Sequence, residues 1–180
     1  FEDASQNYRI YRSQTIIDHK EQILKEVDGA LERFDSMFPG QDRTWSYKSY
    51  NTFSLTAHSL LFYTIFKELT TVVREYVGDD RPLWLQSWIN HHNTDTVLDW
   101  HNHYDYICHG YISIEPQQTS TLFEQYVIDN EVGNVYIGPS DRIHKVQVEG
   151  NFTGPRVTIG YDVTDRLGIP GEGNLSFIPI

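Results

Sequence analysis

Histidines are unevenly distributed along this chain. Five of its eight histidines lie between positions 91 and 109, and two of these five, His101 and His103, are separated by a single residue. In an extended segment, residues i and i+2 point to the same face, so both imidazoles can reach one metal ion. Since neutral imidazole is the commonest metal ligand in proteins, this His-x-His pair predicts two ligands of a metal site.

A remote histidine supplies the third predicted ligand. His144 follows the run GNVYIGPS at positions 133–140, which is typical of a strand and then a turn. We expect the turn to deliver His144 at the start of the next strand. Three side chains on one face of an iron ion leave the opposite face open for substrate and dioxygen. The three histidines therefore predict a non-haem iron site.

Asp105 offers a second register for the proximal pair. It lies two residues after His103, so His103 and Asp105 also share a face of an extended segment. With the distal His144, this register gives a set of two histidines and one carboxylate, whereas the first register gives three histidines.

Arg156 and Thr158 form another i, i+2 pair, and Arg156 comes twelve residues after His144. The planar guanidinium fork can bind a carboxylate through two parallel hydrogen bonds, and a neighbouring hydroxyl can add another. The pair therefore predicts a receptor for a carboxylate ligand.

The order and spacing of these motifs resemble a known family. From roughly Leu83 to Val163, the chain resembles the iron(II)- and 2-oxoglutarate-dependent oxygenases, whose pattern is His-x-Asp, a distal His and then Arg-x-Ser/Thr. The resemblance implies a double-stranded β-helix core (a cupin-like jelly roll), iron(II) as cofactor and 2-oxoglutarate as cosubstrate. It also implies that Arg156, with Thr158, binds the far carboxylate of 2-oxoglutarate. Tyr111, on the adjoining strand, is either a further hydrogen-bond partner of the cosubstrate or a core residue.

A narrower resemblance concerns a subgroup found in bacteria and marine phages, whose members carry His-x-His where relatives carry His-x-Asp. It rests on Trp88, the run WHNH at 100–103 and the run CHGY at 108–111. In the family fold, the proximal pair and the next strand lie in different sheets, so the chain must cross between them. If Asp105 were a ligand, little chain would remain before the next strand. We therefore favour His101 and His103.

The resemblance also implies a reaction. Members of the family couple the oxidative decarboxylation of 2-oxoglutarate by dioxygen to the oxidation of a substrate C–H bond, usually as a hydroxylation. The substrate is expected to be a small molecule or a protein side chain.

Two other functions fit the same residues. Gly133, Pro139 and His144 match the spacing of the second cupin motif, with Asp141 in place of its second glycine. A cupin-type dioxygenase with a three-histidine iron site would act without 2-oxoglutarate and would not need Arg156. A non-catalytic β-domain that has kept the fold is the third alternative.

The elements that position these residues follow from the hydrophobic pattern. Residues 15–38 and 55–77 have apolar side chains at helical spacing, with Pro39-Gly40 and Gly78 as expected stops. After Pro82, short β-rich runs separated by turn residues predict strands near 83–90, 97–103, 107–114, 122–126, 134–137, 144–149 and 156–162. We expect one domain over 1–180, in which helices within 1–80 support one outer face of a β-helix core within 81–180.

Composition limits the remaining choices. The formal net charge of −11 makes nucleic acid an unlikely partner, because no cationic surface is implied. No apolar run reaches the roughly 18 residues that a membrane span needs. The single cysteine, Cys108, excludes an internal disulfide and favours a reducing, cytoplasmic location.

Overall fold

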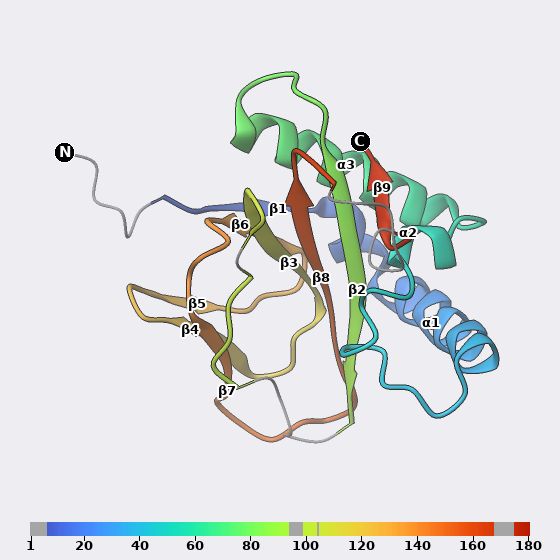
Figure 1. The fold of residues 1–180 in the computed structure, drawn as a ribbon. Helices are drawn as coiled ribbons and strands as arrows, with labels where there is room; N and C mark the ends of the chain where they lie inside the picture. Colours follow the sequence, from blue (N-terminus) through green and yellow to red (C-terminus); the bar gives the residue numbers. More distant parts are fainter. Residues whose placement is uncertain (1–6, 94–98, 104, 168–174) are drawn as a thin grey trace.

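The computed structural model describes residues 7–93, 99–103, 105–167 and 175–180 (Figure 1). Their helices are α1 (Gln14–Met37), α2 (Thr52–Leu55) and α3 (Leu60–Val77). The strands are β1 (Arg9–Arg12), β2 (Trp84–His92), β3 (Cys108–Glu115), β4 (Thr119–Phe123), β5 (Val127–Asp129), β6 (Asn134–Gly138), β7 (His144–Val148), β8 (Arg156–Thr164) and β9 (Phe177–Pro179).

The predicted helices form, with one difference. The first predicted helix is confirmed as α1, whereas the single helix expected over 55–77 is wrong, because the chain breaks between α2 and α3. Ser59 explains the break: its side chain accepts the Phe62 backbone N–H at 3.1 Å and so caps a new helix. At the other end, Gly78 takes the left-handed conformation (φ 83°) that commonly ends a helix, as predicted.

The strands form two antiparallel sheets. The larger has the order β1-β6-β3-β8-β2-β9 and the smaller the order β5-β4-β7. Six of the seven predicted strands are present, although β4 begins and ends about three residues earlier than expected. The strand expected over 97–103 is wrong where it can be checked: positions 94–98 lie outside the described residues, and 99–103 carry only an isolated bridge from His101 to His144. The short strands β1, β5 and β9 were not predicted.

The helices pack on one face of the larger sheet, and the smaller sheet lies across from them (Figure 1). Contacts join α1 to β3, α2 to β2 and α3 to β6. One hydrophobic core includes residues of α1, α3 and the larger sheet, as expected of a single domain, although the extent of that domain over 1–180 stays a prediction.

Strand β8 separates the core from the candidate site. Every residue of β8 is buried, but its two faces differ. Val157, Ile159, Tyr161 and Val163 belong to the core. Because side chains alternate along a strand, Arg156, Thr158 and Asp162 share the opposite face. The fold therefore buries polar side chains on one face of a strand whose other face is apolar.

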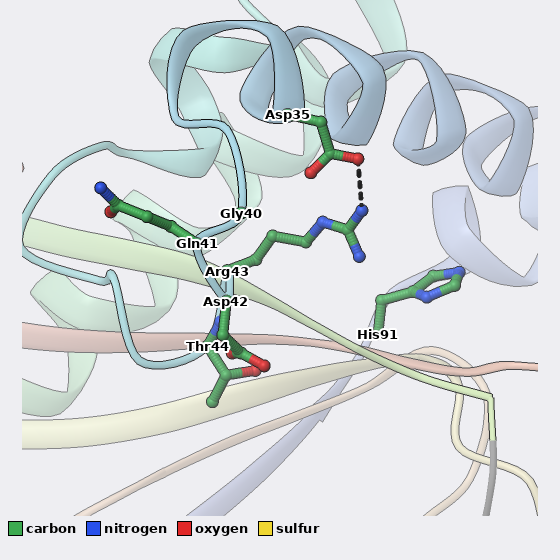
Figure 2. Close-up of a pocket in the computed structure, with 7 residues that line it drawn as sticks. All are labelled: Asp35, Gly40, Gln41, Asp42, Arg43, Thr44 and His91. Carbon is green, nitrogen blue, oxygen red and sulfur yellow. Dashed lines mark hydrogen bonds and ion pairs between the residues drawn. The ribbon is translucent and has the colours of Figure 1, made fainter.

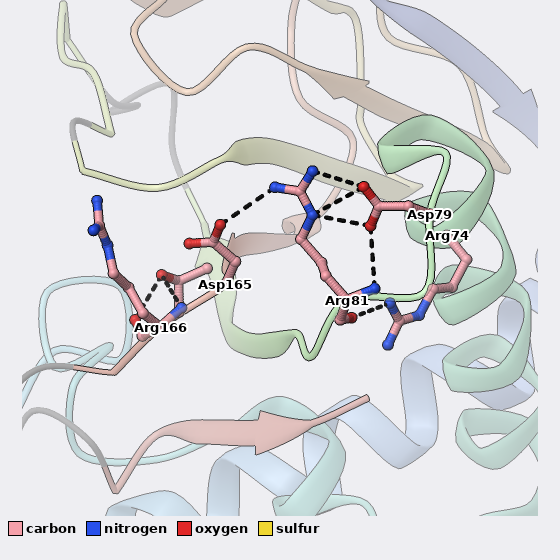
Figure 3. A network of polar contacts seen from close by, with 6 residues as sticks. Arg74, Asp79, Arg81, Asp165 and Arg166 are labelled. Carbon is pink, nitrogen blue, oxygen red and sulfur yellow. Dashed lines mark hydrogen bonds and ion pairs between the residues drawn. The ribbon is translucent and has the colours of Figure 1, made fainter.

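An ion-pair network ties the far end of β8 to the segment before β2 (Figure 3). The Arg81 guanidinium contacts Asp79 at 2.6 Å and Asp165, just after β8, at 3.3 Å. Arg74 of α3 donates hydrogen bonds to the carbonyl groups of Arg81 and Ile180. Through Arg81, these contacts connect α3 to the segment that precedes β2 and to the segment that follows β8.

No helix in the described ranges is long and apolar enough to cross a membrane.

Candidate metal centre

Three histidines from separate parts of the fold converge in the structure. One nitrogen from each of His101, His103 and His144 lies within 4.8 Å of the other two. His101 and His144 exchange backbone hydrogen bonds of 2.9 Å in both directions, and the His103 N–H donates to the Ser140 carbonyl at 3.0 Å. The proximal pair is thus held by irregular pairing beside β7 rather than by a regular strand.

The three rings are oriented so that each can offer its Nε2 atom to a metal ion, because each Nδ1 atom lies close to an oxygen atom. Nδ1 of His101 lies 2.6 Å from the Asp99 carbonyl oxygen, and Nδ1 of His144 lies 2.8 Å from the Arg142 carbonyl oxygen. A carbonyl oxygen can only accept, so both Nδ1 atoms donate and both Nε2 atoms keep a lone pair. Nδ1 of His103 lies 3.1 Å from Asp162 Oδ1, and its Nε2 is buried with no hydrogen-bond partner. This arrangement is the one that metal-binding histidines usually adopt.

The surroundings favour the neutral form of His101 and His144. Burial, followed by neighbouring imidazoles, lowers the pKa of His144 to about 2. Burial also lowers the pKa of His101 below its usual value. A neutral imidazole is the form that binds a metal ion. The donor set therefore fits a divalent transition metal such as iron(II).

Asp105 lies apart from this cluster. It is exposed, has a positive φ of 75°, and belongs to neither group of potential metal ligands among the described residues. A different carboxylate is closer: Asp162 forms the second such group with His103 and His109.

His109 and Asp162 also lie beside the histidine cluster, although the sequence motifs did not include them among the predicted site residues. They are directly opposite each other on β3 and β8, and His109 Nδ1 lies 3.0 Å from Asp162 Oδ1. The His109 ring also stacks on that of His103, with 3.7 Å between ring centroids. Burial, followed by the neighbouring His103, lowers the pKa of His109 to about 4. Burial raises the pKa of Asp162, but the two imidazoles more than offset this, and that pKa lies below its usual value.

The predicted carboxylate receptor lines the same cavity as the three histidines. This cavity has a volume of about 30 Å³, and Arg156, Thr158 and Tyr111 contribute to its wall. Asn90 on β2 orients the receptor by donating from Nδ2 to Thr158 Oγ1 at 3.2 Å, which leaves the Thr158 hydroxyl hydrogen free to be donated.

Arg156 is a buried cation with no counter-ion among the described residues. The residue is only 2% exposed. Its Nε and Nη1 atoms have no hydrogen-bond partner in the described structure. Burial lowers its pKa to about 10, so the guanidinium still carries its charge at neutral pH. The Tyr111 hydroxyl in the same wall is also buried, and no hydrogen bond to it meets the distance and angle limits among the described residues. An anion bound here would satisfy all these groups, since an unpaired buried charge is costly.

A second cavity adjoins the proximal histidines. It shares Trp88, His101 and His103 with the first cavity and has a volume of about 240 Å³. Aromatic rings and one lysine dominate the rest of its wall, contributed by Trp45, Tyr47, Lys48 and Tyr106. Gly160 of β8 makes room for the shared ring, because a Cβ there would lie 2.5 Å from the Trp88 ring.

A third cavity is separate from the histidine cluster (Figure 2). It is polar, and its Arg43 guanidinium is paired with Asp35 at 2.8 Å and lies near His91. His91 and His92 are the last two residues of β2. Neither belongs to a group of potential metal ligands in the described residues.

Comparisons with known proteins support the fold. No protein-family model matches the sequence, and no curated protein matches it. Among solved structures, AviO1 from Streptomyces viridochromogenes is similar with a TM-score of 0.63 and 11% identity, over 93% of this chain and 96% of that one. HygX from Streptomyces hygroscopicus, solved with nickel and 2-oxoglutarate bound, has a TM-score of 0.58 and 14% identity, over 89% and 83% of the two chains. The nickel complex of ThoJ, a non-haem monooxygenase, has a TM-score of 0.62 and 10% identity, over 89% and 74%. At these identities the likeness establishes a common fold.

Proposed function

We propose that this chain is an iron(II)- and 2-oxoglutarate-dependent dioxygenase with His101, His103 and His144 as its iron ligands. The observation that carries the proposal is one cavity in which three imidazoles converge beside Arg156, a buried guanidinium with no counter-ion in the part of the chain that the structure describes. A metal ion and a dicarboxylate together would satisfy both halves of that cavity. The two facing sheets are interpreted as the double-stranded β-helix of this superfamily, and HygX shows that its fold accommodates a metal and 2-oxoglutarate.

The chain's own residues would divide the work. Arg156 would bind the far carboxylate of 2-oxoglutarate through its fork, while Thr158 donates a further hydrogen bond and Tyr111 closes the site from β3. The histidines would hold iron(II) through Nε2, with their Nδ1 hydrogens fixed by Asp99, Arg142 and Asp162. Bound iron would supply dioxygen activation coupled to the oxidation of 2-oxoglutarate.

The second cavity is the proposed substrate site. It shares His101 and His103 with the first cavity but not Arg156, and it is walled by Trp45, Tyr47, Trp88 and Tyr106. Rings of this kind bury flat or cyclic apolar surface well, and Lys48 at the rim can pair with an acidic group. We propose hydroxylation of a small molecule here; a protein side chain of similar shape is the alternative. The His-x-His ligand pair is the basis for placing the chain in the bacterial and phage subgroup.

Arg156 separates this function from a cupin-type dioxygenase. A three-histidine iron site that acts without 2-oxoglutarate has no use for a buried, unpaired guanidinium in its wall. A non-catalytic β-domain has no use for either feature. Binding of 2-oxoglutarate is therefore the deciding property.

The proposal is tested by titrating 2-oxoglutarate into the anaerobic iron(II) protein and following the visible charge-transfer band. A charge-assisted hydrogen bond contributes about 1.5–3 kcal/mol, so Arg156→Ala should raise the apparent Kd roughly tenfold to a hundredfold or more. Arg156→Lys should restore binding only in part, because an ammonium cannot replace the planar fork. Arg166→Ala, at an exposed arginine, is the matched control and should titrate like the wild type. Absence of the band in the wild type would favour the cupin alternative.

A further inference from the structure

Asp162 is a buried carboxylate beside the proposed metal centre that the predicted ligand set leaves unused. It is 1% exposed, yet its Oδ1 lies 3.1 Å from His103 Nδ1 and 3.0 Å from His109 Nδ1. The Nδ1 atoms of two imidazoles therefore lie within hydrogen-bonding distance of one carboxylate oxygen. Burying a carboxylate costs free energy unless it is well hydrogen-bonded, so a role beyond packing is indicated.

We propose that Asp162 is the positioning carboxylate of this metal site, acting on the ion through His103. This inference rests on the proposed function. A set of three histidines lacks the negative charge that a direct carboxylate ligand would bring. Asp162 supplies that charge without contacting the metal, by accepting a hydrogen bond from Nδ1 of the ligand His103. The bond fixes the tautomer that leaves Nε2 for the metal and makes that nitrogen a stronger donor.

The fold supports this role from two sides. Asp162 lies on the site-facing side of β8, with Arg156 and Thr158, and its position opposite His109 is set by strand pairing. His109 is buried and stacks on His103 with only 11° between the ring planes. The stack and the second hydrogen bond hold the carboxylate and the His103 ring in register. His109 is in this way a support for Asp162.

Direct ligation of the metal by Asp162 is a competing assignment that the same residues allow. Ligand atoms of His103, His109 and Asp162 also lie within 4.8 Å of one another, which is a set of two histidines and one carboxylate. Direct ligation is less favoured because both Nδ1 hydrogens would have to leave and the His103 Nε2 atom would stay unpartnered. The assignments differ in which variants abolish metal binding.

The test measures nickel(II) affinity by calorimetry and the Fe(III)/Fe(II) reduction potential of the iron-loaded protein without 2-oxoglutarate. Asp162→Asn keeps the size of the side chain and removes its charge. We expect a loss of nickel affinity of about tenfold to a hundredfold, the usual effect of losing such an outer partner. The reduction potential should rise, because a negative charge that favours the ferric ion is gone. A purely structural role would leave the potential unchanged in the folded variant.

Two further variants make the test decisive. Asp165→Asn, at the partly exposed carboxylate just beyond β8, is the matched control and should change neither quantity. His109→Phe keeps the ring stack and one hydrogen bond to Asp162, so its affinity loss should be smaller than that of Asp162→Asn. Complete loss of nickel in Asp162→Asn together with full binding in His101→Ala would establish direct ligation and overturn the inference.

Failure of the inference is distinguishable from failure of the proposed function. Unchanged affinity and potential in Asp162→Asn, with a normal 2-oxoglutarate band in the wild type, would refute the inference alone. An affinity loss in Asp162→Asn without any band in the wild type would refute the 2-oxoglutarate function and keep the role of Asp162.

Discussion

The arginines near the two ends of β8 differ in exposure and in ion pairing. The near end is the N-terminal end, at Arg156, and the far end is the C-terminal end, next to Asp165. Beyond its far end, Arg81 is about half exposed and is paired with two carboxylates, Asp79 and Asp165 (Figure 3). At its near end, Arg156 is 2% exposed and has no carboxylate partner among the described residues. The first arrangement is the ordinary one for a charged side chain. The second is costly for the ligand-free protein, and this contrast indicates that the near end is built to bind an anion.

The same contrast extends to the histidines. Near Arg156, the Nδ1 atoms of His101, His103 and His144 each have an acceptor, while the other nitrogens face a cavity. In the network around Arg81, the guanidinium is paired with Asp79 and Asp165. No group of potential metal ligands lies there among the described residues. Substitutions at the near end should therefore change ligand binding, and substitutions at the far end should not.

The largest effect is expected from loss of the distal ligand. His144→Ala should weaken nickel(II) binding by more than about a hundredfold, which is beyond the usual effect of losing an outer partner. Asp105→Ala is the control, because that side chain is exposed and lies outside the cluster. Calorimetry on both variants measures this. Loss of binding in both variants would establish the other register of the proximal pair, and retained binding in His144→Ala would remove His144 from the site.

Acid should destabilise the metal-free protein through its buried histidines. The folded-state pKa values of about 2 for His144 and about 4 for His109 lie below the unfolded value of about 6.5. The unfolded chain therefore binds more protons below pH 6.5, and stability is full above that pH and falls as the pH falls toward 4. Each group contributes about 1.4 kcal/mol per pH unit, so we expect a loss of roughly 2–4 kcal/mol between pH 7 and pH 5. Urea unfolding at the two pH values checks this; equal free energies of unfolding would contradict it, and His144→Gln should show a smaller loss.

The smallest effect concerns stability at the two arginines. Arg156→Met removes a buried, unpaired charge and should leave the free energy of unfolding of the ligand-free protein unchanged or raise it by roughly 1–4 kcal/mol. Arg81→Met removes exposed ion pairs and should lower it by at most about 1 kcal/mol. Urea unfolding of both variants makes the comparison. A large loss of stability in Arg156→Met would mean that the arginine has a structural role and would remove the contrast between the two ends.

Local sequence patterns were sufficient for most of the framework. Apolar residues at helical spacing predicted α1, and Gly78 predicted the end of α3, because both signals are contained within a few neighbouring residues. The strands β1, β5 and β9 have only three or four residues and are too short for a period of two to be recognised. The strand expected over 97–103 failed because its histidines are held by backbone bonds to His144 and Ser140, which are remote in sequence.

The candidate site was predictable to the extent that its residues lie in short motifs. The pairs His101/His103 and Arg156/Thr158 are each visible as i, i+2 spacings, and the structure brings both pairs into one cavity. Their roles as ligands stay predictions. Asp162 was missed because its partners lie on β3 and in the 99–103 segment, and only strand pairing brings them together. The alternation of Arg156, Thr158 and Asp162 on one face of β8 is the signal that could have identified it from the sequence.

A crystal structure grown anaerobically with iron(II) and 2-oxoglutarate tests the central claim most directly. The account predicts one iron ion bonded to the Nε2 atoms of His101, His103 and His144, at about 2.1 Å from each, which is typical of a metal–imidazole bond. It also predicts a carboxylate of 2-oxoglutarate paired with the Arg156 guanidinium. Iron bound by His103, His109 and Asp162, or 2-oxoglutarate absent from Arg156, would contradict the account.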